Sequence, residues 1–209
     1  MVSDLLSEAR ALTTGSRRLL GITGPPGAGK STLARALVTA LGHRAVLVGM
    51  DGFHLPDEEL VRLGRRDRKG APDTFDAEAY ADLLRRLRAG TDTVLAPDFD
   101  RATDAPVPDG IRVPVTVPLV VTEGNYLLLR EGEWAGVRPL LDACWYVDVD
   151  DSVRLPRLVD RHHLHGKSRT DALRWASGSD QANADLVART QPRADRLVTA
   201  AELDAILAI

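Results

Sequence analysis

The chain has 209 residues, of which 44% are hydrophobic and 27% are charged, and its formal net charge is −3. This apolar content is enough for a packed core and excludes a wholly disordered chain, while the slightly acidic balance argues against a protein that coats nucleic acid. The lone cysteine, Cys144, excludes an internal disulfide and a cysteine-cluster metal site, and no apolar stretch approaches the roughly 20 residues of a membrane-spanning helix.

The apolar pattern alternates short buried runs with amphipathic stretches. Strands are predicted at residues 19–22, 45–50, 93–97, 113–117, 119–122, 143–149 and 197–198. Pro114 and Pro118 favour an edge position for the fourth of these strands. Helices are predicted at residues 30–41, 76–89, 153–161, 171–189 and 201–207. The charged stretches 57–73 and 162–170 are expected to be loops beside a site.

Strands that alternate with helices indicate an α/β fold with a doubly wound, mostly parallel sheet. No repeat or low-complexity linker divides the sequence. We therefore expect a single domain over residues 1–209, in the cytoplasm, with neither a membrane nor a nucleic-acid partner.

A glycine-rich segment follows the first predicted strand and precedes the first predicted helix. It reads Gly24-Pro25-Pro26-Gly27-Ala28-Gly29-Lys30-Ser31 and matches G-x-x-x-x-G-K-[ST] at every fixed position. Small residues let backbone N–H groups wrap around phosphate oxygens, and the helix that follows directs its positive end at the same anion. Lys30 is expected to reach the β- and γ-phosphates and Ser31 to place its hydroxyl on Mg²⁺. Thr32 completes the predicted nucleotide-binding segment.

Two acids follow predicted strands. Asp51 comes after residues 45–50 and Glu123 after residues 119–122, and ligands of parallel α/β sheets gather at the carboxyl ends of strands. We expect Asp51 to accept a proton from an attacking hydroxyl and Glu123 to organise Mg²⁺. The alternative for each acid is a helix cap.

Four segments together resemble one family of P-loop kinases, which includes uridine kinase, bacterial pantothenate kinase and phosphoribulokinase. They are residues 24–32, 51–56, 68–76 and 123–125. The resemblance implies a P-loop kinase fold with a small lid, and transfer of the γ-phosphoryl group of ATP, with Mg²⁺, to a hydroxyl of a small molecule. A nucleoside is the first candidate acceptor, and pantothenate or a sugar of the fructose type are alternatives. A nucleotide-dependent switch is the alternative from another class, although no Asn-Lys-x-Asp stretch accompanies the loop.

Residues on the acceptor side are expected in a loop over residues 52–75 and after the strand at 93–97. His54 follows Asp51 by three residues, and the resemblance puts acceptor contacts near residues 98–101. The predicted substrate-side residues are His54, Lys69, Phe75, Phe99, Asp100, Arg101, Tyr126 and Asn183. The resemblance is also compatible with a homo-oligomer.

A basic stretch is the predicted lid, over about residues 154–170. Arg154, Arg157 and Arg161 recur at helical spacing, and Gly166 offers a hinge. Arginines stabilise the charge that spreads over a γ-phosphate during transfer, and the resemblance assigns Arg157 and Arg161 to this role. The alternative is a solvated helix face. His162, His163 and His165 are expected to be lid surface rather than a metal site.

The chain has only three lysines, Lys30, Lys69 and Lys167, among 27 basic residues. Because a lysine ammonium is a compact point charge and a guanidinium is a planar fork, these positions are expected to be ones where the fork does not fit. Cys144 and the tryptophans Trp134, Trp145 and Trp175 are expected to pack in the protein interior.

Overall fold

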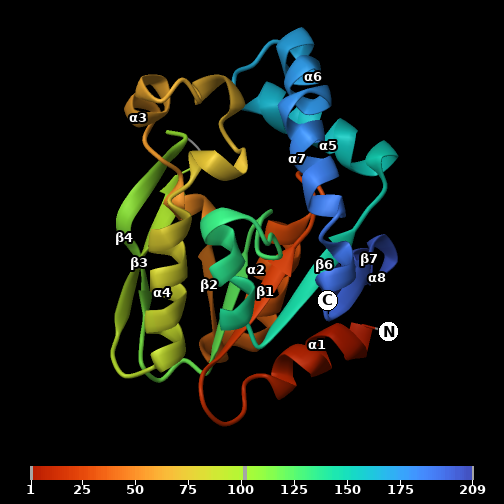
Figure 1. Ribbon diagram of the computed structural model, residues 1–209. Helices are drawn as coiled ribbons and strands as arrows, with labels where there is room; N and C mark the ends of the chain where they lie inside the picture. The colour runs from red at the N-terminus through yellow and green to blue at the C-terminus, as the bar shows by residue number, and fades with distance from the viewer. Residues whose placement is uncertain (1, 101–102, 209) are drawn as a thin grey trace.

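The computed structural model describes residues 2–100 and 103–208. Within them, a sheet of five parallel strands has the order β2-β5-β1-β6-β7 (Figure 1). The strands are β1 (Arg18–Thr23), β2 (Ala45–Gly49), β5 (Leu119–Glu123), β6 (Ala143–Asp148) and β7 (Arg196–Thr199). The chain begins the sheet at β1, in the middle, and adds strands on both sides, so the predicted doubly wound parallel sheet is confirmed.

Both faces of this sheet are buried because apolar residues occupy consecutive strand positions. In β1, Leu19 lies in the core on one face, whereas Leu20 and Ile22 lie in the core on the other. The helices α1 (Val2–Ala11), α2 (Lys30–Leu41) and α8 (Ala200–Leu207) cover the second face. The helix α4 (Ala77–Ala89) covers the first face.

The hairpin beside the sheet differs from prediction. The strand predicted at residues 93–97 is β3 (Val94–Asp100), and it pairs antiparallel with β4 (Ala105–Val113) in a separate two-stranded sheet. The strand predicted at residues 113–117 is wrong, because Val113 ends β4 and a turn follows in which Val117 N–H donates to the Pro114 carbonyl (3.1 Å). Proline has no N–H to give a strand ladder, which explains why the strand ends there.

The helical elements around the carboxyl ends of the strands also differ from prediction. The stretch 57–73 is not all loop, because it contains α3 (Asp57–Arg62), and α5 (Asp151–Leu164) extends past the predicted end at residue 161. The helix predicted at 171–189 is two helices, α6 (Arg169–Ser177) and α7 (Ser179–Ala188), separated by Gly178. Helix α1 was not predicted.

Two segments face each other across one end of the molecule in Figure 1: α3 with its following loop, and the helices α5 to α7. Together with the loop after β1 they enclose the cavity described below. None of the helices in the described ranges is long and apolar enough to cross a membrane.

Candidate active site

The glycine-rich segment forms a tight turn between β1 and α2. Gly24, Gly27 and Gly29 all have positive φ angles, of 146°, 81° and 98°, which suit glycine far better than residues with a Cβ. Lys30 begins α2, and its Nζ donates to the Pro25 carbonyl (3.0 Å) while only 8% of the residue is exposed. This turn at a helix N-terminus is the geometry that binds phosphate.

A hydroxyl and a carboxylate meet beside this turn. Ser31 Oγ donates to Glu123 Oε1 at 2.7 Å. Glu123 ends β5 and lies opposite Ile22 of the neighbouring β1, so two adjacent strand ends hold the pair. Both groups offer oxygen ligands, which Mg²⁺ prefers, and the residues present therefore fit a magnesium ion.

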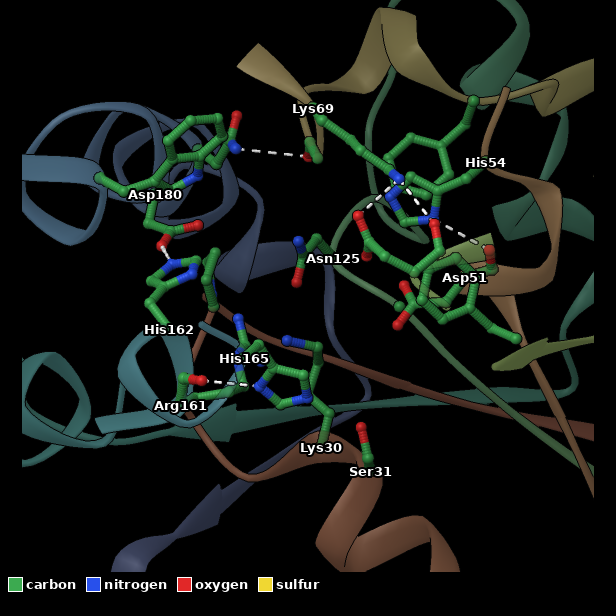
Figure 2. A pocket seen from close by; sticks show the side chains of 18 of the residues that line it. Lys30, Ser31, Asp51, His54, Lys69, Asn125, Arg161, His162, His165 and Asp180 are labelled. Atoms are coloured by element: carbon green, nitrogen blue, oxygen red, sulfur yellow. Dashed lines mark hydrogen bonds and ion pairs between the residues drawn. The ribbon is translucent and has the colours of Figure 1, made fainter. Parts of the chain in front are cut away.

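Asp51 lies in a 3₁₀ turn, Met50–Phe53, directly after β2. Because Gly49 of β2 is in register with Glu123 of β5, the two acids leave neighbouring strand ends. Asp51 lines the same cavity as Lys30 and Ser31 (Figure 2). A carboxylate there can accept a proton from a hydroxyl held in the cavity.

The larger cavity has a volume of about 620 Å³. Figure 2 shows His54, Asp51 and Lys69 on one side of it, His162 and Asp180 on the other, and Lys30 and Ser31 at its base. Many of the predicted site residues line this cavity: Pro26, Lys30, Ser31, Asp51, His54, Lys69, Phe75, Phe99, Glu123, Arg161 and Asn183.

His54 has a fixed orientation in the cavity wall. Its Nδ1 lies 2.9 Å from the Asp51 carbonyl oxygen, which can only accept, so Nδ1 carries the proton and Nε2 is an acceptor. The ring centroid lies 4.0 Å from that of Phe75 and 5.1 Å from that of Phe99. Burial lowers the pKa of His54, so the imidazole is neutral at pH 7.

A second cavity, of about 370 Å³, also adjoins the phosphate loop. Gly27, Gly29 and Thr32 line it from the loop and α2, and Arg157 lines it from α5. Lys30, Ser31 and Arg161 line both cavities. The two cavities therefore adjoin each other at these three residues.

Comparison with known proteins agrees with this geometry. Residues 19–201 match the phosphoribulokinase / uridine kinase family. The chain belongs to this family. A Schizosaccharomyces pombe protein named as a candidate uridine kinase is 36% identical over 191 residues, which cover 86% of this chain and 81% of that protein.

Two further relatives of this kinase are informative. The crystal structure of a candidate fructose transport system kinase from Silicibacter sp. TM1040 has 33% identity and a TM-score of 0.85, covering 95% of this chain and 98% of that one. A pantothenate kinase from Levilactobacillus brevis is 32% identical over 152 residues, which cover 70% of this chain and 50% of that enzyme. Family membership makes the protein a P-loop kinase that uses ATP and phosphorylates a hydroxyl of a small molecule.

Some predicted site residues of the kinase lie outside the larger cavity. Tyr126 is fully buried, burial raises its pKa, and its hydroxyl donates to the Gly70 carbonyl. Tyr126 therefore supports the loop that contains Gly70 from the protein interior. Asp100 accepts from Thr103 Oγ1 (3.0 Å) at the end of β3 and does not line the cavity. Arg101 lies outside the described residues.

The three lid arginines do not share one environment. Arg157 and Arg161 line cavities, but Arg154 is only 1% exposed, with Nε donating to Asp151 (2.6 Å) and Nη2 to Gln181 (2.5 Å). Arg154 therefore differs from Arg157 and Arg161 in its surroundings, although the three recur at helical spacing. Arg154 joins α5 to α7 because the helices pack closely enough to bury it.

Sequence reasoning missed several residues on the lid side of the kinase cavity. His162 Nε2 lies 2.6 Å from Asp180 Oδ2, and the Lys167 ammonium lies 4.5 Å from the ring centroid of Trp175. Trp134 and Trp145 are buried as expected, whereas Trp175 lines the cavity. In the described ranges no cluster of three or more His, Cys, Asp or Glu side chains could hold a metal ion.

Proposed function

We propose that the protein transfers the γ-phosphoryl group of ATP to a hydroxyl of a neutral polyhydroxylated molecule, with a nucleoside as the first candidate. One observation carries the proposal. Lys30, Ser31, Asp51 and Glu123 line a single cavity, and Ser31 Oγ lies 2.7 Å from Glu123 Oε1. Phosphate-binding, metal-binding and proton-accepting groups therefore surround a space large enough for a small acceptor.

The proposed reaction is an in-line displacement on the γ-phosphorus. The Asp51 carboxylate accepts the proton of the acceptor hydroxyl as its oxygen bonds to phosphorus, and the bond to the β–γ bridging oxygen breaks to release ADP. Lys30, Arg157 and Arg161 stabilise the negative charge on the phosphoryl oxygens. Because Lys30 and Arg161 line both cavities, they stand at the junction between donor and acceptor.

Ser31 and Glu123 would hold Mg²⁺, since each offers an oxygen ligand and the two already lie within hydrogen-bond distance. The ion would neutralise charge on the β- and γ-phosphates. With the ion bound, Ser31 Oγ and the Glu123 carboxylate would serve as its ligands in place of their mutual hydrogen bond.

In this proposal residues 1–209 form one P-loop kinase domain, with a lid at about residues 154–170 and a substrate-side loop at about 52–75. Arg161 projects from α5 and lines the cavity from the lid. Asn183 of α7 donates to the Gly70 carbonyl (3.3 Å), which links the lid side to the substrate-side loop. Closure would exclude water and suppress hydrolysis of ATP.

A nucleoside is supported by the aromatic wall and by a relative. His54, Phe75 and Phe99 line the cavity, and the His54 ring contacts both of the others, which provides an apolar surface for a planar base. Asp51 offers a carboxylate to the ribose hydroxyls. The relative from S. pombe that is 36% identical is named as a candidate uridine kinase.

A sugar of the fructose type is the second candidate. It is supported by the structural relative with a TM-score of 0.85, which is named as a candidate fructose transport system kinase. Pantothenate has weaker support, since the chain spans about half the length of the pantothenate kinases it matches. The kinase family also favours an enzyme over a nucleotide-dependent switch.

The test is an acceptor screen with ATP and Mg²⁺, in which product mass is measured for uridine, cytidine, fructose, pantothenate and ribulose 5-phosphate. We expect the mass of a phosphorylated nucleoside, and we expect formation of this product to depend on Asp51. A phosphorylated sugar with no phosphorylated nucleoside would select the second candidate. ATP turnover that no acceptor stimulates would contradict the proposal.

A further inference from the structure

Four charged side chains form a connected cluster: Asp57, Arg66 and Lys69 of the substrate-side loop, and Asp104, which directly precedes β4. Lys69 Nζ lies 2.8 Å from Asp57 Oδ1, 2.7 Å from Asp104 Oδ2 and 2.8 Å from the Asp104 carbonyl oxygen. An ammonium has three N–H donors, so these three contacts use all of them. The Lys69 side chain is 8% exposed, which keeps competing water away from most of it.

The second base of the cluster is also paired. Arg66 Nε donates to Asp57 Oδ2 (2.7 Å). Burial raises the pKa of Asp57, but hydrogen bonds and charges from Lys69 and Arg66 outweigh burial and lower it. Two acids and two bases therefore cancel each other in formal charge at neutral pH.

This cancellation matters because Arg66, Lys69 and Asp104 all line the larger cavity. A lysine whose donors are all used has none left for a carboxylate or phosphate on an acceptor. The Asp104 carboxylate beside it repels such an anion, and it can accept hydrogen bonds from hydroxyl groups.

We propose that Asp104, together with Asp57, determines acceptor specificity by holding Lys69, so that the cavity excludes acceptors with a negative group at this position and admits neutral polyhydroxylated ones. The inference rests on the proposed function, because it concerns the acceptor side of the same cavity. It adds a residue, Asp104, that lies 53 positions from the proposed base along the chain.

The other cations of the cavity lie elsewhere. Lys30 and Arg161 line both cavities and so belong to the phosphate end. Lys167 lies over Trp175 on the lid. An acceptor whose anionic group bound Lys167 would contradict the proposal, so this lysine is included in the test.

The experiment compares wild type with Asp104→Asn and a matched control, Asp73→Asn. Asparagine adopts positive φ readily, which suits position 104, where φ is 52°. Asp73 pairs with Arg68 (2.6 Å) in the same loop and does not line the cavity, so its replacement removes the same charge outside the site. For each protein, kcat/KM and Kd are measured with uridine and fructose, and with pantothenate and ribulose 5-phosphate.

We expect wild type to prefer the neutral acceptors. Asp104→Asn should raise the ratio of anionic to neutral kcat/KM, and of the corresponding affinities, by about tenfold or more, and Asp73→Asn should leave both ratios unchanged. An unchanged ratio in a folded Asp104→Asn protein would overturn the inference. So would a wild-type preference for an anionic acceptor that Lys167→Met abolishes.

Failure of the proposed function can be recognised separately. If wild type phosphorylates none of the acceptors, the proposed function is contradicted, while the binding titrations still test the specificity. The inference is overturned, whatever the turnover, if wild type and Asp104→Asn bind pantothenate and ribulose 5-phosphate with equal affinity. The same holds if neither protein binds these two compounds detectably.

Discussion

Gly27 lies where the phosphate loop contacts α5, which begins the proposed lid, and replacing Gly27 with alanine tests that contact. Its φ is 81°, and a Cβ atom there would lie 2.8 Å from both the Arg154 carbonyl oxygen and Leu158 Cγ. The first contact is with the backbone of α5, and Leu158 is fully buried. Neither neighbour can yield without moving the helix or the loop.

The expected cost has two parts. An alanine with positive φ costs about 1–2 kcal/mol, and forcing a methyl group into a packed contact costs about 1–3 kcal/mol more. Gly15 isolates the first part, because its φ is 82° and a Cβ atom there would have no neighbour within 4 Å. We therefore expect Gly15→Ala to lose about 1–2 kcal/mol and Gly27→Ala about 2–5 kcal/mol.

Urea unfolding at equilibrium measures both losses, and titration calorimetry with ATP and Mg²⁺ measures binding. Gly27→Ala should also weaken ATP binding, since relief of the contact displaces backbone N–H groups of the loop. Gly15→Ala should bind ATP as wild type does. Equal destabilisation of the two variants, with ATP affinity intact in both, would refute the proposed contact between loop and lid.

Four further predictions follow from the same geometry. Asp51→Asn should lower turnover about 10²–10⁴-fold while ATP affinity, measured by calorimetry, stays unchanged; wild-type turnover would remove Asp51 from the mechanism. Lys30→Ala should abolish product formation, and full activity would discredit the phosphate site. Tyr80→Phe removes the hydroxyl that lies 2.6 Å from the buried Thr122 hydroxyl, and should cost about 0.5–1.5 kcal/mol in urea unfolding, because Thr122 still donates to the Val48 carbonyl; no loss would show that the bond contributes nothing. Burial lowers the pKa of His54 below 6.5, so the unfolded chain takes up this proton before the folded protein does as the pH falls. The free energy of unfolding should therefore decrease in wild type as the pH drops below about 6.5, and it should decrease less in His54→Gln. Identical pH profiles of the two proteins would contradict the lowered pKa.

The central sheet could be predicted because its signal is local. Residues 119–122 are a short apolar run, and β5 buries every position from Leu119 to Glu123. The hairpin was mispredicted because β4 is largely exposed and carries prolines, so its pairing with β3 leaves little trace in hydrophobicity. Helix α1 did leave a signal, since Leu5, Leu6 and Ala9 recur at helical spacing and are buried.

The candidate site likewise has one part that could be predicted from the sequence and another that could not. The phosphate loop is eight consecutive residues, so its geometry follows from a local motif. The partners of Lys69 are 12 and 35 residues away, and His162 meets Asp180 across two helices. Such pairs depend on how separate elements pack together, and no spacing in the sequence specifies that packing.

The three lysines relate the composition of the sequence to the geometry of the site. All of them line the larger cavity, and each ammonium occupies a place that suits a point charge. Lys30 reaches the Pro25 carbonyl from a buried position, Lys69 divides three donors among three acceptors on two segments, and Lys167 lies over the ring of Trp175. A guanidinium is larger and presents its donors in one plane, so it cannot reproduce the convergent contacts of Lys69. Arginine supplies nearly all other positive charge in the chain, so Lys69 marks a place where the geometry of the cavity requires a single compact cation, whereas the ring contact of Lys167 would also suit a guanidinium.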